Sequence, residues 1–209
     1  MGIPVLVHES NAFPGVTTKM LAKDVTKILV AMEDAKKRLD ARYAGKVEVT
    51  GNPVRQEMIF ADKNAARKKL GLDSRPVILS IGGSLGAEQI NRAVAEVISV
   101  SAKDDRYQHI HAYGKYGGWF PELLREKGVE LSKHPNLDVR EYIHNMPDCM
   151  AAADLVICRA GAMTVSELQI LGKAAILIPS PNVAENHQYY NARSLSDRKA
   201  GVLIEEKDL

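Results

Sequence analysis

From residue 76 onward, the sequence repeats one pattern: a short apolar run, then small residues, then an amphipathic stretch. The first instance is the run at residues 76–81, which ends in Gly82-Gly83. Ile90, Val94 and Ile98 then share one face of a helix expected at residues 87–100. A continuous apolar run is typical of a parallel strand that is covered on both faces. This pattern therefore favours strands joined by helical crossovers.

The same alternation continues to the end of the chain. Strands are expected at residues 76–81, 107–113, 137–143, 154–159, 174–179 and 202–204. Helices are expected at residues 87–100, 121–127, 147–153, 164–171 and 187–199. Right-handed crossovers between such strands give a parallel sheet. The predicted fold class is a doubly wound, Rossmann-like α/β domain over residues 56–209.

Residues 1–55 form a separate α/β pattern. Strands are expected at residues 5–7, 27–31 and 47–49, with helices at 17–23 and 35–40. Two or three strands bury too little apolar surface to form a stable hydrophobic core by themselves. We therefore expect residues 1–55 to be the end of another α/β domain, and both ends of the chain to be cut from a longer protein.

Composition excludes several classes of protein. The net charge is only +2, from 28 basic and 26 acidic residues, which disfavours a nucleic-acid partner bound through bulk charge. Cys149 and Cys158 lack zinc-site or CxxC spacing and are expected to be buried thiols of a cytosolic protein. No apolar run approaches the roughly 20 residues that span a bilayer. No loop carries an Asp-x-Asp motif, so no metal site and no cofactor is predicted.

The strongest local signal is the glycine-rich turn at residues 82–87, between a strand and a helix. Glycine lets the main chain approach a ligand closely, and amides at a helix start attract anions. A diphosphate suits this turn, with Ser84 as an added hydroxyl donor. The alternative is a turn that only connects two elements. The turn is not a P-loop, because no Gly-Lys-Ser/Thr follows.

A second junction at residues 159–167 also passes from a strand through small residues into a helix. Thr164 is a candidate helix cap, and Glu167 has the spacing of a capping box. In that interpretation Glu167 only satisfies backbone amides. In the functional interpretation Glu167 accepts hydrogen bonds from a ribose diol. The sequence leaves both open.

A third signal is His187 with Gln188, at the start of a helix that follows a strand and loop. Such a position points toward the carboxyl edge of the sheet, where open α/β folds bind ligands. A single histidine there is also common as a cap or surface residue. Together, an imidazole and an amide suit sugar hydroxyl groups.

In this order, the motifs resemble those of the lipid I N-acetylglucosaminyltransferases of bacterial cell-wall synthesis, the MurG family. The matching stretches are HESN at residues 8–11, PG at 14–15, GNPVR at 51–55, GGSLGA at 82–87, YIHNM at 142–146, RAGAMTVSE at 159–167 and HQYYNA at 187–192. The family often has glutamine where Ser10, Leu85 and His187 stand, and acidic residues near His144 and Asn145. The departure at His187 makes its sugar contact less secure than that of Gln188.

The resemblance implies a GT-B glycosyltransferase fold, with a donor site in this chain and no catalytic residue. It implies that Arg55 and Ser84 contact the diphosphate, that Met163 and Thr164 approach the phosphates, and that Glu167 binds the ribose. Ile143 would contact the uracil through its main chain, and His187 and Gln188 the N-acetylglucosamine. His8, Glu9 and Asn11 would face the acceptor.

The implied reaction moves N-acetylglucosamine from UDP-GlcNAc to lipid I, at the cytoplasmic face of the bacterial plasma membrane. The family's Gly-Gly-Thr-Gly-Gly-His loop, which carries the expected base, is absent from this sequence. The chain is therefore expected to be inactive without the missing N-terminal segment of the same enzyme. Two alternatives stay open: a donor-binding subunit of a split transferase, or another GT-B UDP-sugar enzyme such as an epimerase.

Overall fold

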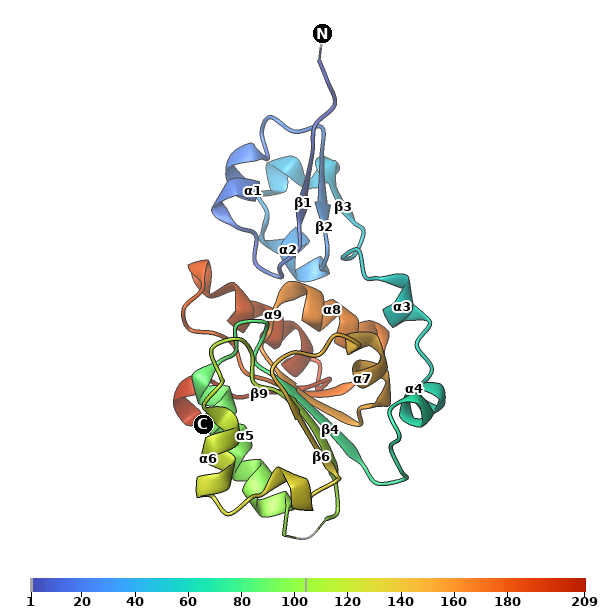
Figure 1. Ribbon diagram of the computed structural model, residues 1–209. Coiled ribbons are helices and arrows are strands. Elements are labelled where there is room, and N and C mark those ends of the chain that lie inside the picture. Colours follow the sequence, from blue (N-terminus) through green and yellow to red (C-terminus); the bar gives the residue numbers. More distant parts are fainter. Residues whose placement is uncertain (1, 104) are drawn as a thin grey trace.

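The computed structural model describes residues 2–103 and 105–209, which contain two parallel sheets (Figure 1). The smaller sheet has the order β1-β2-β3. Its strands are β1 (Leu6–Glu9), β2 (Lys27–Val30) and β3 (Val47–Val49). The helices α1 (Val16–Leu21) and α2 (Glu33–Arg38) connect them. Ile28, Val30 and Ala35 are buried in a small core of this unit.

Two short helices between the sheets were not predicted from the sequence. They are α3 (Gln56–Ile59) and α4 (Lys63–Lys69). The Asp62 side chain caps α4 by accepting a hydrogen bond from the Ala65 amide at 2.7 Å. Both helices are too short to show a helical period, so their positions depend on packing instead. Met58 and Ala66 supply that packing by being buried.

The larger sheet is entirely parallel and has the order β6-β5-β4-β7-β8-β9. Its strands are β4 (Val77–Ile81), β5 (Gln108–Ala112), β6 (Leu137–Arg140), β7 (Leu155–Cys158), β8 (Ala174–Leu177) and β9 (Val202–Leu203). The chain runs outward from β4 to one edge, then returns and runs to the other. This is the doubly wound arrangement, and it confirms the predicted fold class.

Helices cover both faces of the larger sheet (Figure 1). They are α5 (Glu88–Ser101), α6 (Phe120–Glu126), α7 (Met146–Ala152), α8 (Ala162–Ile170) and α9 (His187–Ser196). Single 3₁₀ turns lie at Ala41–Lys46, Leu131–Lys133, Ala184–Asn186 and Glu206–Asp208. The alternating side chains of β4 separate the two faces: Leu79 packs in the core under α7, α8 and α9, and Ile78 against the core under α5 and α6.

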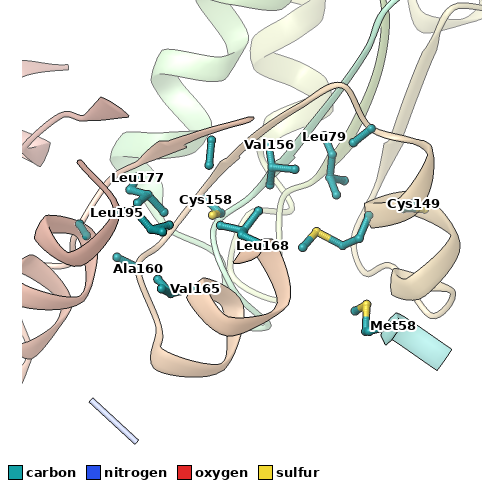
Figure 2. Close-up of a cluster of buried hydrophobic side chains, with 14 of the residues drawn as sticks. Met58, Leu79, Cys149, Val156, Cys158, Ala160, Val165, Leu168, Leu177 and Leu195 are labelled. Carbon is teal, nitrogen blue, oxygen red and sulfur yellow. The ribbon is translucent and has the colours of Figure 1, made fainter. Parts of the chain in front are cut away.

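The core under α7, α8 and α9 reaches beyond the larger sheet. Figure 2 shows Leu79, Val156 and Leu168 at its centre, with Met58 at its margin. Ala12 and Met32, which come from the smaller sheet's part of the chain, belong to the same cluster. The two sheets are therefore held against each other by shared apolar burial. The predicted domain boundary after Arg55 falls between them and stays a prediction.

Cys149 and Cys158 are both free and buried, as predicted. Burial raises the pKa of the Cys149 thiol to about 11 and that of Cys158 to about 12. Among the described residues, no helix is both long and apolar enough to cross a bilayer.

Candidate functional site

The two glycine-containing junctions lie side by side at one edge of the larger sheet. Strands β4 and β7 are neighbours, and Ile81 pairs with Cys158 at their carboxyl ends. The order of strands reverses between these two, because β5 lies on the other side of β4 and β8 on the other side of β7. Open α/β folds bind ligands at such a reversal point. The structure thus brings the predicted Ser84 and Thr164 junctions together.

The first junction requires glycine at defined positions. A Cβ atom at Gly82 would lie 2.6 Å from the Ala87 amide nitrogen, and one at Gly86 would lie 2.3 Å from the Tyr113 carbonyl oxygen. Gly86 also has a φ of 88°, which disfavours side chains. Ser84 is exposed at the tip of this turn. The tight turn therefore places the exposed Ser84 shortly before the start of α5, at the carboxyl end of β4.

The second junction differs from the sequence prediction. Helix α8 begins at Ala162 with Gly161 as its N-cap, and no side chain caps it. Thr164 lies inside the first turn, so the predicted Thr164 cap and its capping box with Glu167 are wrong. The backbone is extended at Gly161 and helical from Ala162, so the helix begins two residues earlier than the threonine suggested. The first amides of α8 consequently have no side-chain cap and are suited to an anion.

Glu167 on α8 and Arg55 in the linker between the sheets are close enough to interact electrostatically. Burial raises the pKa of the half-buried Glu167 carboxyl, and the nearby Arg55 guanidinium partly offsets this effect. Arg55 itself is exposed at the start of α3. Without the capping box, Glu167 has no role at the helix start, and its carboxylate can accept hydrogen bonds from a ligand.

His187 and Gln188 lie in the first turn of α9, after β8. The Ser180 amide donates a 2.9 Å hydrogen bond to Gln188 Oε1, and His187 Nδ1 lies 2.8 Å from the Ala184 carbonyl oxygen. The preceding Glu185 and Asn186 both have positive φ, of 51° and 52°. This strained turn sets the direction in which α9 begins.

Ile143 follows β6, and its side chain is buried in the core. Only its main chain is therefore available to a ligand, and its contact with the uracil stays a prediction. Met163 is exposed on the first turn of α8.

The predicted acceptor-side residues make hydrogen bonds within the protein. His8 Nε2 lies 3.0 Å from the Gly51 carbonyl oxygen, and its ring is exposed. Glu9 is buried and accepts hydrogen bonds from two amides of the loop that follows β1 and from the Thr18 hydroxyl of α1. Asn11 donates to Glu9 and accepts from Asn191. Their contact with an acceptor stays a prediction.

Two asparagines of the sequence motifs, Asn52 and Asn191, were not predicted to have a role. Asn191 is completely buried, and Asn52 bonds to both sides of the junction between the sheets. Arg159 likewise donates to the Pro179 carbonyl oxygen and pairs with Glu206. The only sequence signal for these contacts is that Asn52, Arg159 and Asn191 stand within the matching stretches.

Two of the cavities on the larger unit bear on the position of the site. One of about 770 Å³ lies between the late turns of α8 and α9 and the starts of β7 and β8, at the edge opposite the junctions. Another of about 580 Å³ borders Gln89, Ser180 and Asn186, beside the starts of α5 and α9. The second is nearer to the predicted ligand groups, so size alone does not identify the site. Across residues 2–103 and 105–209, no cluster of His, Cys, Asp or Glu side chains is suited to hold a metal ion.

Residues 77–209 match the model of the glycosyltransferase family 28 C-terminal domain. A relative from Acetivibrio thermocellus, named UDP-N-acetylglucosamine--N-acetylmuramyl-(pentapeptide) pyrophosphoryl-undecaprenol N-acetylglucosamine transferase, is 47% identical over 210 residues. The match covers 100% of this chain and 55% of that protein. A relative of the same name from Clostridioides difficile is 42% identical, with 99% and 50% covered. The chain thus spans about half the length of the curated relatives it matches.

Solved structures agree with this similarity. MurG from Acinetobacter baumannii superposes with a TM-score of 0.74 and is 29% identical, covering 100% of this chain and 55% of its own. The UDP-GlcNAc 2-epimerase from Neisseria meningitidis gives a TM-score of 0.63 at 16% identity, with 98% and 57% covered. The second likeness concerns the fold alone, which is GT-B as predicted.

Proposed function

Because this chain belongs to glycosyltransferase family 28, we propose that it is the donor-binding part of an enzyme that transfers N-acetylglucosamine from UDP-GlcNAc to lipid I, forming lipid II. The observation that supports this most is the pair of adjacent junctions at the carboxyl ends of β4 and β7. Each offers uncapped helix-start amides, and a diphosphate has enough oxygens to contact both.

In this proposal the diphosphate lies between Ser84 and the first turn of α8, where Met163 and Thr164 are close to it. Arg55 adds a full positive charge at the same place. Glu167 accepts hydrogen bonds from the ribose hydroxyl groups. The uracil contacts the main chain at Ile143.

The sugar lies toward the start of α9. Gln188 and His187 bind the N-acetylglucosamine hydroxyl and acetamido groups. The Ser180 amide holds the Gln188 carbonyl oxygen, so the Gln188 side-chain NH₂ group points its donors elsewhere. An amide donor fixed in this way has less rotamer freedom to lose when a sugar binds.

The proposed chemistry is a direct displacement at the anomeric carbon with inversion. The acceptor hydroxyl loses its proton to a base, its oxygen forms the new bond, and UDP leaves with the electron pair of the broken bond. Negative charge then grows on the diphosphate, next to Arg55 and the amides of both junctions. One preorganised donor of this kind is worth roughly 3 kcal/mol in a closed site.

The base and most of the acceptor site belong, in this proposal, to the part of the enzyme that this chain does not span. Lipid I is held at the cytoplasmic face of the membrane, so the complete enzyme acts there as a peripheral protein. We expect the purified chain to bind the donor and to transfer little sugar. Robust transfer to a soluble lipid I analogue would contradict this division of roles.

Titration calorimetry with UDP-GlcNAc, UDP-glucose and UDP tests the proposal. We expect all three to bind, with UDP-GlcNAc favoured over UDP-glucose because of contacts to the acetamido group. Preference for UDP-glucose would indicate another GT-B enzyme. No binding of any uridine nucleotide would overturn the donor site itself.

A further inference from the structure

Asn191 joins the two sheets through its side chain. It lies on the buried face of α9 and is 0% exposed. Its Oδ1 accepts a 2.8 Å hydrogen bond from the Ala12 amide. Its Nδ2 donates to Asn11 Oδ1 at 3.0 Å and to the Ala160 carbonyl oxygen at 3.1 Å. Both hydrogens of the Asn191 NH₂ group are thus donated, one to each of two segments that are far apart in sequence.

The two segments have different places in the fold. Asn11 and Ala12 belong to the loop that follows β1 in the smaller sheet. Ala160 lies between the end of β7 and Gly161, the N-cap of α8. Asn191 therefore connects the loop of one sheet to the backbone immediately before the second junction.

The loop is itself made rigid by Glu9. The carboxylate accepts hydrogen bonds from the amides of Asn11 and Gly15, from the Thr18 hydroxyl and from Asn11 Nδ2. Burial alone would raise the pKa of Glu9, but these bonds outweigh it and lower that pKa. Glu9 thus stays ionised and keeps Asn11 in place to meet Asn191.

Asn52 makes a second connection between the same parts. Its Nδ2 lies 3.2 Å from the Ser10 carbonyl oxygen, 3.4 Å from the Ala162 carbonyl oxygen and 2.9 Å from Ser166 Oγ. Ala162 and Ser166 are on the first turns of α8. The two residues that flank Gly161 are therefore both held by asparagines, Ala160 by Asn191 and Ala162 by Asn52.

The contacts around this bridge are apolar or charged. The rings of Phe13 and Tyr190 stack at 4.6 Å between centroids, and Arg38 lies over Tyr190 at 4.8 Å. Because this packing excludes water around buried amide groups, a lost hydrogen bond there leaves an unsatisfied partner and costs more than an exposed one. The backbone before α8 is consequently sensitive to Asn191.

We propose that Asn191, together with Asn52, is a positioning residue for the donor diphosphate. By holding Ala160 and Ala162, the two asparagines set the direction of the α8 amides at the phosphates, and they couple this direction to the loop after β1. This inference rests on the proposed function. It gives Glu9 and Asn11 a role in ordering the donor side as well.

Asn191→Asp is the most specific test. The aspartate side chain keeps the shape of asparagine and the oxygen that accepts from the Ala12 amide, but it replaces the NH₂ group that donates to the Ala160 carbonyl oxygen with a second acceptor. At pH 8 we expect UDP affinity to fall by at least about tenfold, measured by calorimetry on the full chain. A carboxyl buried among acceptors has a raised pKa. Lowering the pH toward 5.5 then protonates it, restores one donor and recovers part of the lost affinity relative to wild type.

Ser194→Ala is the matched control. The Ser194 hydroxyl is buried on the same helix and donates to the Asn191 backbone carbonyl oxygen, so its loss weakens α9 without touching either sheet connection. We expect this variant to lose stability and keep its UDP affinity. Circular dichroism confirms that each variant is folded at the temperature of titration.

The outcomes separate the two claims. If the wild-type chain binds no UDP, the proposed function fails. If wild type binds but Asn191→Asp binds equally well at every pH, the positioning role is overturned. Should Asn191→Asp not fold, Asn52→Ala at the half-exposed end of the bridge carries the same prediction of weaker UDP binding, and unchanged affinity there contradicts it.

Discussion

At the scale of single residues, Glu167 is the proposed ribose ligand, and its pKa makes that proposal testable. Its pKa is raised because burial outweighs the effect of Arg55. Only the ionised form accepts hydrogen bonds on both oxygens. The side chain is therefore expected to bind the ribose well above its pKa and poorly below it.

We predict that Glu167→Gln weakens UDP binding by about 10–100-fold at pH 8, as expected for a hydrogen bond to a charged group. The UDP affinity of wild type should fall as pH decreases toward the raised pKa of Glu167. The UDP affinity of the variant should not show this fall, because glutamine does not titrate. Calorimetry across pH measures both. Glu126→Gln, on the exposed surface of α6, is the control. Equal affinities for wild type and Glu167→Gln would remove the ribose role.

Two buried histidines give the larger sheet a dependence on pH that is unrelated to the ligand. Ser80 Oγ lies 2.7 Å from His109 Nε2 and 2.8 Å from His111 Nδ1. Burial lowers the pKa of His109 to about 4, and burial with the neighbouring His109 lowers that of His111 to about 3. Both rings are therefore neutral at neutral pH, and the Ser80 hydroxyl can donate to one of them while it accepts from the other.

The unfolded chain therefore binds protons that the folded chain refuses between pH 6.5 and about 4. Stability is full above this window and falls as pH decreases through it, because the folded state excludes the protons that the unfolded histidines bind. We predict that His109→Gln flattens the dependence of unfolding free energy on pH in this window. Denaturant titrations between pH 7 and 4.5 measure it. Parallel curves for wild type and variant would contradict the assignment.

At the scale of elements, helix α9 ends in a conformation that its residue does not favour. Lys199 follows the helix with a φ of 56°, and the Ala200 amide bonds back to the Leu195 carbonyl oxygen. This is the position where glycine is most common after a helix. A lysine there carries left-handed strain of roughly 1–2 kcal/mol.

We predict that Lys199→Gly stabilises the protein by up to about 1 kcal/mol, because relief of strain exceeds the roughly 0.4–1 kcal/mol that glycine adds to unfolded-state freedom. Lys199→Ala keeps the strain and should leave stability nearly unchanged. Thermal unfolding of the two variants distinguishes them. A Lys199→Gly variant less stable than Lys199→Ala would show that the turn is not strained.

Elements with strong periodic patterns were predictable, and those set by packing were not. The apolar run before Gly82 predicted β4 because both faces of that strand are covered. Strand β6 was predicted to reach Ile143 but ends at Arg140. Leu137 and Val139 pack on the α5 and α6 face, whereas Ile143 belongs to the opposite core, so the chain has to leave the sheet between them.

At the scale of the whole molecule, the predicted groups of the larger unit come from loops and from the first turns of helices at one edge of its sheet. That convergence was predictable, because parallel strands all present their carboxyl ends to the same side. The bridge through Asn191 and Asn52 was not, because it depends on how the two sheets dock. Ala12 and Asn191 bond across a separation that no local pattern encodes.

The central claim is that the junctions at Ser84 and Thr164 jointly hold a pyrophosphate. The most direct test is an NMR titration of the isotope-labelled chain with UDP, following backbone amides. We predict the largest shift changes at residues 83–88 and 161–165, with the same dissociation constant from both groups. Shift changes at one junction alone, or mainly at the cavity between the late turns of α8 and α9, would contradict the account.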